Sequence, residues 1–160
     1  MTRILVVVLF GLLAVTGVAA EPESDSAAGQ YYTANALYNR KLYSAAIPEY
    51  RAFLKQYPQH AKEESARLGL ALSLFGMGNY GEAEPLLAAL VAKGKGIDKA
   101  QLTLLLGQCQ LKTRGSDSAE ETFAAAANAA GAVEFRNTAL ALLTEAVSYT
   151  HLTLPTIYSV

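Results

Sequence analysis

Apolar residues in the middle of this chain recur every three or four positions, the spacing that places them on one face of a helix. Two such stripes follow one another between residues 30 and 60, with a polar break near residues 40–43. Further breaks come at residues 76–79 and 114–116, where Gly and Asn favour the left-handed conformation that ends a helix. The pattern therefore predicts an all-α chain of paired helices, without strands between residues 30 and 130.

The predicted helix pairs are copies of one another. The segment 43–48 reads Tyr-Ser-Ala-Ala-Ile-Pro, and the segment 80–85 reads Tyr-Gly-Glu-Ala-Glu-Pro, so Tyr, Ala and Pro recur at the same offset. A third copy follows, in which Ala119 stands at the position of Ala83, and a fourth opens at Ala132. Self-similarity at a period near 36 residues is typical of helical repeat proteins.

Each repeat has small residues where its two helices touch and a large residue that fills the gap to the next repeat. A small side chain lets two helix axes approach toward the short end of the usual range of about 8–10 Å. A single hairpin cannot cover its own apolar face, so the hairpins must stack. The predicted structural positions are small Ala46, Ala83 and Ala119 and large Tyr50, Leu87 and Phe123.

The order of small residue, Leu, Tyr-x-x-Ala, large apolar residue and Pro resembles the tetratricopeptide repeat (TPR) family. The first repeat carries the fullest match, at Leu37, Tyr43, Ala46, Tyr50, Phe53 and Pro58. The segment 51–58, Arg-Ala-Phe-Leu-Lys-Gln-Tyr-Pro, further resembles periplasmic TPR proteins of the Tol-Pal-associated and outer-membrane-assembly kinds. The resemblance covers residues 29–146 and weakens in the third repeat, where Ser116 stands at the Tyr position and no Pro closes the unit.

The resemblance implies a TPR-like α-solenoid of antiparallel hairpins that binds other proteins. We predict three repeats at about residues 30–60, 62–93 and 98–130, and a partial fourth at residues 132–146. In this family the first helix of each hairpin lines a concave groove that takes peptides or partner helices. Carried over by register, the groove residues are Tyr31, Asn35, Tyr38 and Asn39 in the first repeat, Leu68, Leu72 and Phe75 in the second, and Leu104, Gln108 and Lys112 in the third.

These groove positions favour one mode of binding over another. Asn and Tyr side chains on a helix face can bond an extended peptide backbone, and Phe75 can act as an apolar anchor. Family members that clamp a terminal carboxylate use several basic groove residues, whereas here only Lys112 is basic. The alternative for Tyr38, Phe75 and Leu111 is that they pack against neighbouring repeats instead of facing a partner.

The N-terminus has the three parts of a secretory signal peptide. Arg3 precedes an apolar run over residues 4–20 that ends in Val-Ala-Ala, and a polar linker follows at residues 21–29. We predict cleavage after Ala20 and an exported protein of the periplasm or cell envelope. The alternative is an uncleaved anchor, although the run would span only about 26 Å as a helix, less than the ~30 Å core of a bilayer.

The C-terminus departs from the repeat pattern. Residues 147–160 contain no Asp, Glu, Lys or Arg, and residues 147–156 resemble the translation of an adapter used in DNA library preparation. The resemblance implies that residues 147–160 are a non-native tail and that the natural protein continues past Ala146; the alternative is a native strand or loop. His151 is therefore no catalytic candidate.

The partial fourth repeat has a predicted first helix without its partner. Terminal repeats normally need a polar outer face. This helix would instead expose an apolar side, and we expect self-association or fraying there. The residues concerned are Phe135, Leu140, Leu142 and Leu143.

Composition and motifs argue against catalysis. The 13 Lys and Arg residues nearly balance the 14 Asp and Glu residues, so the basic surface of a nucleic-acid binder is missing. Cys109 is the only cysteine, which excludes an intrachain disulfide and fits a small core residue. His60 has no metal-binding partners in sequence, and the glycines of residues 93–96 lack the strand and spacing of a phosphate-binding loop. We predict no enzyme activity, cofactor, metal, nucleic acid or membrane partner beyond the signal segment.

The function predicted is that of an exported, non-enzymatic scaffold that binds another protein or peptide on its concave face. The alternative is that these repeats form the N-terminal module of a longer exported protein, whose C-terminal part carries an enzymatic or anchoring domain.

Overall fold

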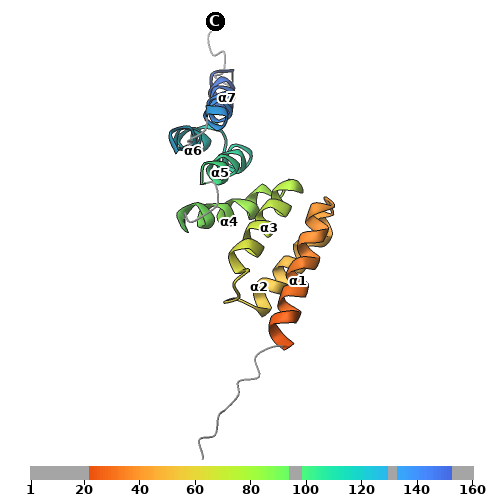
Figure 1. Cartoon of the computed structure of the whole chain (residues 1–160). Coiled ribbons are helices and arrows are strands. Elements are labelled where there is room, and N and C mark those ends of the chain that lie inside the picture. The colour runs from red at the N-terminus through yellow and green to blue at the C-terminus, as the bar shows by residue number, and fades with distance from the viewer. Residues whose placement is uncertain (1–21, 94–98, 130–132, 153–160) are drawn as a thin grey trace, which may run out of the picture.

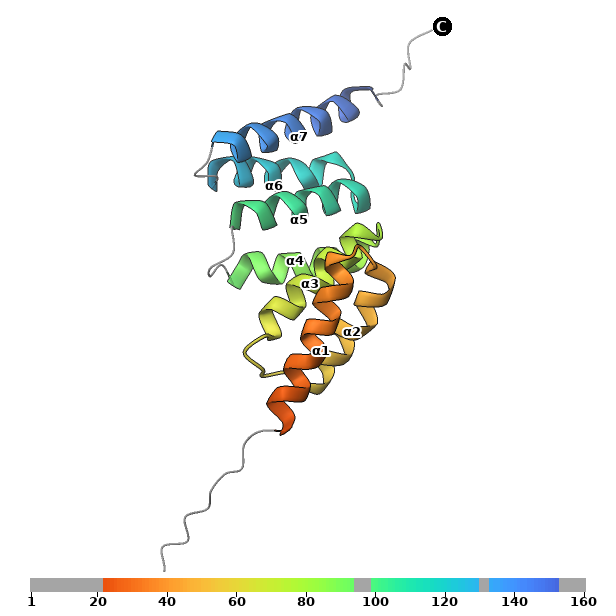
Figure 2. The same ribbon diagram turned by 45° about the vertical axis from the view of Figure 1, so that its right-hand side comes forward.

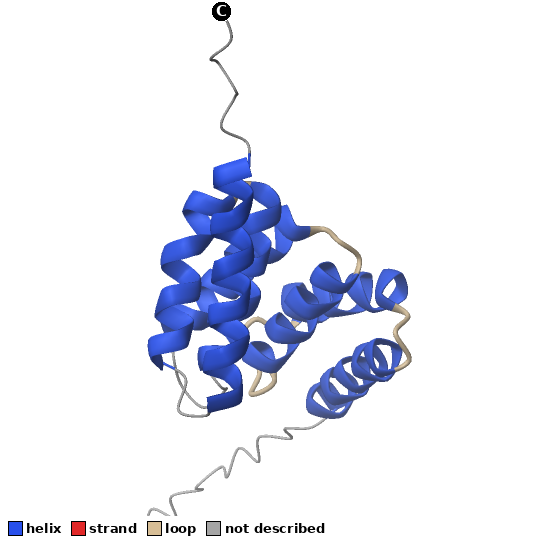
Figure 3. Cartoon of the chain, turned by 90° about the horizontal axis from the view of Figure 1, so that it is seen from above, coloured by secondary structure: helices blue, strands red, loops and turns tan. Residues whose placement is uncertain are grey.

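The structure is a computed structural model that describes residues 22–93, 99–129 and 133–152. All regular structure in these residues is helical (Figures 1 and 3). The helices are α1 Pro22–Asn39, α2 Tyr43–Gln56, α3 Glu63–Gly76, α4 Tyr80–Lys93, α5 Lys99–Thr113, α6 Ser116–Ala129 and α7 Val133–Leu152. The predicted all-α repeat fold is confirmed.

Consecutive helices pack against each other all along the chain, so the structure is a stack of hairpins. Hairpin 1 is α1–α2, hairpin 2 is α3–α4 and hairpin 3 is α5–α6, while α7 lies on α6 as the first helix of a fourth unit (Figure 2). The turns fall at the breaks that the sequence predicted. One buried core runs through α1 to α5, and two smaller buried clusters join α5, α6 and α7.

The turns of the first two hairpins share one backbone geometry. Lys41 and Gly78 have φ angles of 60° and 78°, in the left-handed region. The next residue then donates its N–H back across the turn, from Leu42 to the Leu37 carbonyl at 3.0 Å and from Asn79 to the Leu74 carbonyl at 2.9 Å. This bond satisfies a carbonyl that the helix end would leave unpaired. Hairpin 1 therefore uses lysine where hairpin 2 uses the glycine that this conformation favours.

The repeat positions occupy equivalent, buried positions in the three hairpins. Ala46, Ala83 and Ala119 have no exposed surface, and each lies in the first turn of the second helix. The large residue one turn later is also buried: the exposed fraction is 1% for Tyr50 and 0% for Leu87. Phe123 is likewise at 0%, and its ring packs so closely on Gly107 of α5 that an added Cβ there would lie 2.6 Å from a ring carbon.

The first helix differs from the sequence prediction. Helix α1 begins at Pro22, inside the segment predicted to be a linker, and Ala27 is fully buried. Proline suits the first turn of a helix because its missing N–H would have no partner there. The Tyr57 hydroxyl donates to Ser26 Oγ at 3.3 Å, which ties this early turn to the end of α2.

The last helix also extends further than predicted. Helix α7 continues to Leu152, so residues 147–152 are helical and not a strand or loop. Leu142 and Leu143 pack against the buried Phe123, while Leu140 remains 46% exposed. Hairpin 3 therefore covers part of the apolar face expected on α7, at Leu142 and Leu143.

Several predictions lie outside the described residues. The signal peptide and its cleavage after Ala20 fall in residues 1–21, and residues 153–160 hold the end of the predicted tail. The side chain of Phe135 is likewise not described. Among the described helices, no segment is long and apolar enough to cross a membrane.

Candidate partner-binding surface

The first helices of successive units lie along one side of the stack, as the groove prediction requires. Helix α1 contacts α3, and α5 contacts α7. Helices α3 and α5 make little direct contact with each other, because α5 meets hairpin 2 through α4 (Figure 2). The face is therefore continuous across the first junction, between hairpins 1 and 2, and across the last, and it opens at the second junction, between hairpins 2 and 3.

In hairpin 1 the predicted groove residues Tyr31 and Asn35 contact side chains of the second helix in the same hairpin. The Tyr31 ring lies 5.8 Å from Phe53 and 6.5 Å from Tyr50, centroid to centroid. Asn35 Oδ1 accepts a hydrogen bond from the Tyr50 hydroxyl at 3.2 Å. Burial, with nearby Tyr31 second, raises the pKa of Tyr50 to about 12, which keeps the hydroxyl protonated as the donor. Only Asn39 is fully exposed toward solvent.

The aromatic groove residues pair with the first residue of the second helix in their own hairpin. Tyr38 lies 5.7 Å from Tyr43, and Phe75 lies 5.3 Å from Tyr80 with the two rings at 77°. These ring contacts lie within one hairpin, whereas the packing alternative predicted contacts with a neighbouring repeat. In hairpin 3 the equivalent second-helix residue is Ser116, so no such ring pair forms there.

The remaining predicted residues divide between two places. Leu68 packs partly on the main core, and Leu104 packs on the small cluster of Ala126, Ala127 and Ala139, while Leu72 is half-buried on α3. Phe75, Gln108 and Lys112, in contrast, meet around a hollow of about 190 Å³ at the second junction.

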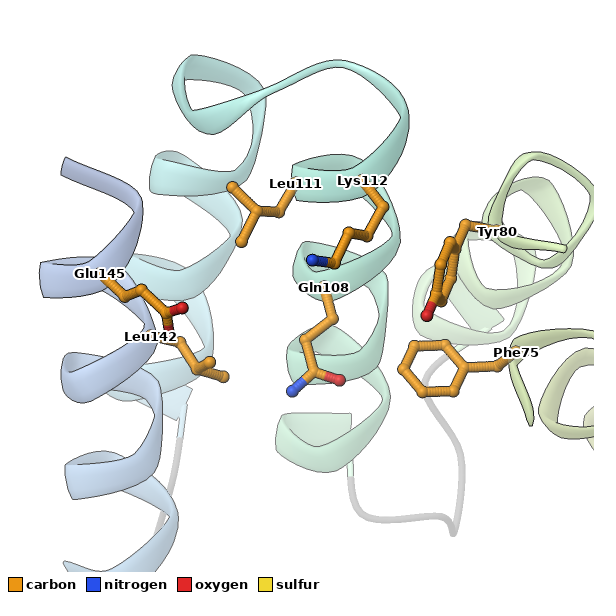
Figure 4. A pocket seen from close by; sticks show the side chains of 7 residues that line it. All are labelled: Phe75, Tyr80, Gln108, Leu111, Lys112, Leu142 and Glu145. Carbon is orange, nitrogen blue, oxygen red and sulfur yellow. The ribbon is translucent and has the colours of Figure 1, made fainter. Parts of the chain in front are cut away.

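This hollow, called the junction hollow below, is bounded by three helices of the first-helix face and by the start of α4. Figure 4 shows Phe75 and Tyr80 pointing toward Gln108 and Lys112, with α7 on the other side of α5. Its lining residues are Phe75, Tyr80, Gln108, Leu111, Lys112, Leu142 and Glu145. Four of these, Tyr80, Leu111, Leu142 and Glu145, were not among the predicted groove residues.

The two junctions differ in sequence at the place where the hollow lies. At the first junction the Tyr43 ring packs onto Gly76, where an added Cβ would lie 2.6 Å from a ring carbon. The residue at the position of Gly76 in the next repeat is Lys112, and there Lys112 and Tyr80 both line the hollow. The seam is therefore closed at the first junction and open at the second.

The opposite side of the second junction is held by a polar bridge. Glu84 of α4 is only 7% exposed and pairs with Arg114 at 2.6 Å, and it accepts a hydrogen bond from Thr113 Oγ1 at 2.8 Å. Burial, with the Glu84 charge as the smaller cause, raises the pKa of the nearby Cys109 thiol to about 11. A thiol with such a pKa stays protonated at neutral pH and is a poor nucleophile.

The charges at the rim of the junction hollow are free. Lys112 on α5 and Glu145 on α7 are both exposed, and neither forms an ion pair with a described residue. The side chain of Gln108, between them, makes no hydrogen bond with a described residue. The surface thus offers a recess with apolar and polar walls, together with an amide and two opposite charges that have no partner among the described residues.

The described residues offer no candidate metal site. They contain no group of three His, Cys, Asp or Glu residues placed to hold a metal ion. His60 Nδ1 accepts a hydrogen bond from the Lys62 N–H at 3.0 Å and its ring packs on Phe53, so it stabilises the loop. A second, wider hollow of about 400 Å³ lies between α2 and α4, beside the exposed Arg51–Glu82 ion pair.

Comparison with known proteins agrees with this fold. A family model described as "Tetratricopeptide repeat" matches residues 13–61 and 68–133. No curated protein matches the sequence.

Several solved structures are similar to this chain at low sequence identity. PcrH from Pseudomonas aeruginosa matches with a TM-score of 0.62 and 18% identity, covering 85% of this chain and 99% of its own. MamA from Desulfovibrio magneticus matches with a TM-score of 0.61 and 20% identity, covering 83% and 80%. The type III secretion translocator chaperone SycD from Yersinia enterocolitica matches with a TM-score of 0.54 and 21% identity, covering 81% and 90%.

Proposed function

Because the chain belongs to the tetratricopeptide repeat family, we propose that it is a protein-interaction scaffold that binds a segment of another protein on its first-helix face. The observation that carries this proposal is the junction hollow, which gathers Phe75, Gln108 and Lys112 from two repeats into one recess. A partner segment lying across these helices could bury an apolar side chain there and bond the bare amide. One of the similar structures, SycD, is described as a translocator chaperone, which is consistent with a binding role.

Site-specific photo-crosslinking tests this proposal. The full-length chain would carry p-benzoylphenylalanine in place of Gln108, in the junction hollow, or in place of Lys55, an exposed residue of α2. We expect a discrete adduct from position 108, identified by mass spectrometry, and none from position 55. Equal labelling at both positions would show nonspecific contact and contradict a binding face on the first helices.

We further propose that the protein is exported to the periplasm or cell envelope, on the basis of Arg3, the apolar run at residues 4–20 and its Val-Ala-Ala end. Cell fractionation with mass spectrometry of the mature N-terminus tests this. The expected result is a periplasmic chain that begins at Glu21. A membrane-bound chain that retains residues 1–20 would support the anchor alternative instead.

The alternative role, as the N-terminal module of a longer exported protein, rests on α7. This helix contacts α5 and α6 as the first helix of a fourth unit would. Sequencing the natural gene past the codon for Ala146 decides between the two roles. A stop codon shortly after the fourth repeat would rule out a longer protein.

Self-association through α7 is a separate proposal, supported by the exposed Leu140. Sedimentation of the full-length chain over a range of concentrations tests it. A Leu140→Gln variant should shift the equilibrium toward monomer. A wild-type chain that stays monomeric at all concentrations would contradict it.

A further inference from the structure

The junction hollow has a chemistry more specific than a general protein-binding face. We infer that it is a pocket for one aromatic side chain of an extended partner segment, and that an acidic residue beside that side chain pairs with Lys112. This inference rests on the proposed function, because it names the occupant of the same face.

The size of the hollow fits a single ring. A dry apolar cavity of roughly 150 Å³ is large enough to bind benzene. The junction hollow, at about 190 Å³, therefore has room for one phenyl or phenol group. It is open to solvent on one side, so a side chain can enter without displacing a helix.

The walls favour an aromatic occupant. Phe75 and Tyr80 meet edge to face, with centroids 5.3 Å apart and planes at 77°. Such a pair leaves a ring face or edge free for a third ring, since aromatic groups prefer tilted or offset contacts. Leu111 and Leu142 supply the aliphatic part of the lining. Both the shape and the polarity of these walls thus match a ring.

The amide at the rim favours an extended segment over a helix. Gln108 presents one acceptor and two donor hydrogens, and no described residue bonds them. The backbone of an extended peptide has free N–H and C=O groups that need partners, whereas a helix satisfies most of its own. An extended segment can therefore use Gln108, and a helix gains little from it.

The unpaired charges set the sequence and direction of the segment. Lys112 lies on the α5 side of the hollow and Glu145 on the α7 side (Figure 4). An acidic residue next to the buried ring is attracted by Lys112, while a second acidic residue toward α7 is repelled by Glu145. The preferred segment therefore carries its acidic residue on one side of the ring only.

Selection from a random peptide library displayed on phage, with the full-length chain as bait, tests this inference. We expect enriched peptides to contain Phe, Tyr or Trp with Asp or Glu one or two residues away. In synthetic versions of a selected peptide, replacing the aromatic residue by Ala should abolish measurable binding. Replacing the acidic residue by Lys should weaken binding roughly five- to tenfold, as expected for turning a rim attraction into a repulsion.

A charge exchange on the protein supplies the matched control. The Lys112→Glu variant should prefer the Lys version of the peptide over the acidic one, reversing the wild-type order. Lys55→Glu makes the same change of charge at an exposed position of α2 and should leave the order unchanged. Both substitutions are at exposed side chains, and circular dichroism checks that the variants remain folded.

The outcomes separate this inference from the proposed function. Peptides that bind the first-helix face but lack the aromatic–acidic pair, or that ignore Lys112→Glu, would overturn the pocket and leave the scaffold intact. A selection that enriches no peptide would overturn both.

Discussion

The two junctions between the first three hairpins are built from the same repeat and yet differ on the concave side. At the first junction two rings from α2 pack onto glycines of α3: Tyr43 onto Gly76, and Tyr50 onto Gly69, where an added Cβ would overlap the ring. At the second junction Lys112 replaces the glycine, Tyr80 lines a hollow, and α3 and α5 barely touch.

The other side of the second junction compensates for this opening. Helix α4 packs fully along α5, and the bridge from Glu84 to Thr113 and Arg114 ties the two helices together. The comparison teaches that the seam between first helices is sealed where rings pack onto glycines and forms a recess where the equivalent glycine is replaced. The stack can therefore lose contact on its binding face without losing its continuity.

The largest effect is expected from overfilling the first junction. Gly69→Val would place two methyl groups inside the space of the Tyr50 ring and should lower the free energy of unfolding by about 3 kcal/mol. Gly29→Val is the matched control, since nothing lies within 4 Å of a Cβ at that exposed position of α1. Chemical denaturation measures both; equal losses would show that the first junction is not tightly packed.

High pH should affect the second junction before the first. Burial raises the pKa of the Cys109 thiol from 9.0 to about 11, so folding favours its protonated form. Its stabilising contribution is complete below pH 9 and is lost as pH rises from 9 to 11, by about 2 kcal/mol. The Tyr50 hydroxyl, with its pKa raised from 10.0 to about 12, adds a second loss that begins about one pH unit higher.

Cys109→Ala separates the two alkaline phases. The variant should lose the phase between pH 9 and 11 and keep the later phase from Tyr50. The measurement is the free energy of unfolding in urea at several pH values. A wild-type chain whose stability is flat up to pH 11 would contradict the burial of Cys109.

Breaking the polar bridge at the second junction should cost less. Arg114→Ala leaves the buried Glu84 carboxylate with Thr113 alone, and we expect a loss of about 1–2 kcal/mol. The matched control is Arg51→Ala, because Arg51 pairs with Glu82 on the exposed surface between α2 and α4. That pair should contribute less than about 0.5 kcal/mol. If thermal melts showed the same loss of stability for Arg114→Ala and Arg51→Ala, the buried Glu84 bridge would contribute no more than the exposed ion pair.

The smallest stability change is expected when the second junction is made to resemble the first. Lys112→Gly removes a side chain that lines the hollow together with Tyr80, while glycine in the last turn of α5 costs up to about 1 kcal/mol of helix stability. The gain from closer packing should offset most of that cost, leaving a net change below about 0.5 kcal/mol. Nuclear Overhauser contacts between the Tyr80 ring and residue 112 should appear; their absence would mean that Lys112 does not hold the hollow open.

The repeats could be predicted from sequence because their information is local and periodic. The polar, Gly- and Asn-containing breaks between apolar stripes predict every hairpin turn, and the offset between copies aligns Ala46, Ala83 and Ala119. The start of α1 at Pro22 was missed because the acidic, serine-containing segment before residue 30 lacks an apolar stripe. Helix α7 continued past residue 146 although its composition changes there.

The site was harder to predict, for reasons that lie in three dimensions. The structure brings the predicted groove residues Phe75, Gln108 and Lys112 to one hollow. Asn35, also predicted to lie in the groove, accepts a hydrogen bond from Tyr50 inside hairpin 1, a contact that register alone does not reveal. Glu145 was missed because the fourth repeat has no reliable register. One sequence signal of the hollow is that the second repeat has glycine, Gly76, at the position where the third repeat has Lys112.

The most direct test is a titration of the isotope-labelled full-length chain with a selected aromatic–acidic peptide, followed by amide chemical shifts. The account predicts the largest shifts around the second junction, at Phe75, Tyr80, Gln108 and Lys112. At the first junction, the amides of Gly69 and Tyr43 should change little. Shifts centred on the first junction, or spread evenly over all seven described helices, would contradict it.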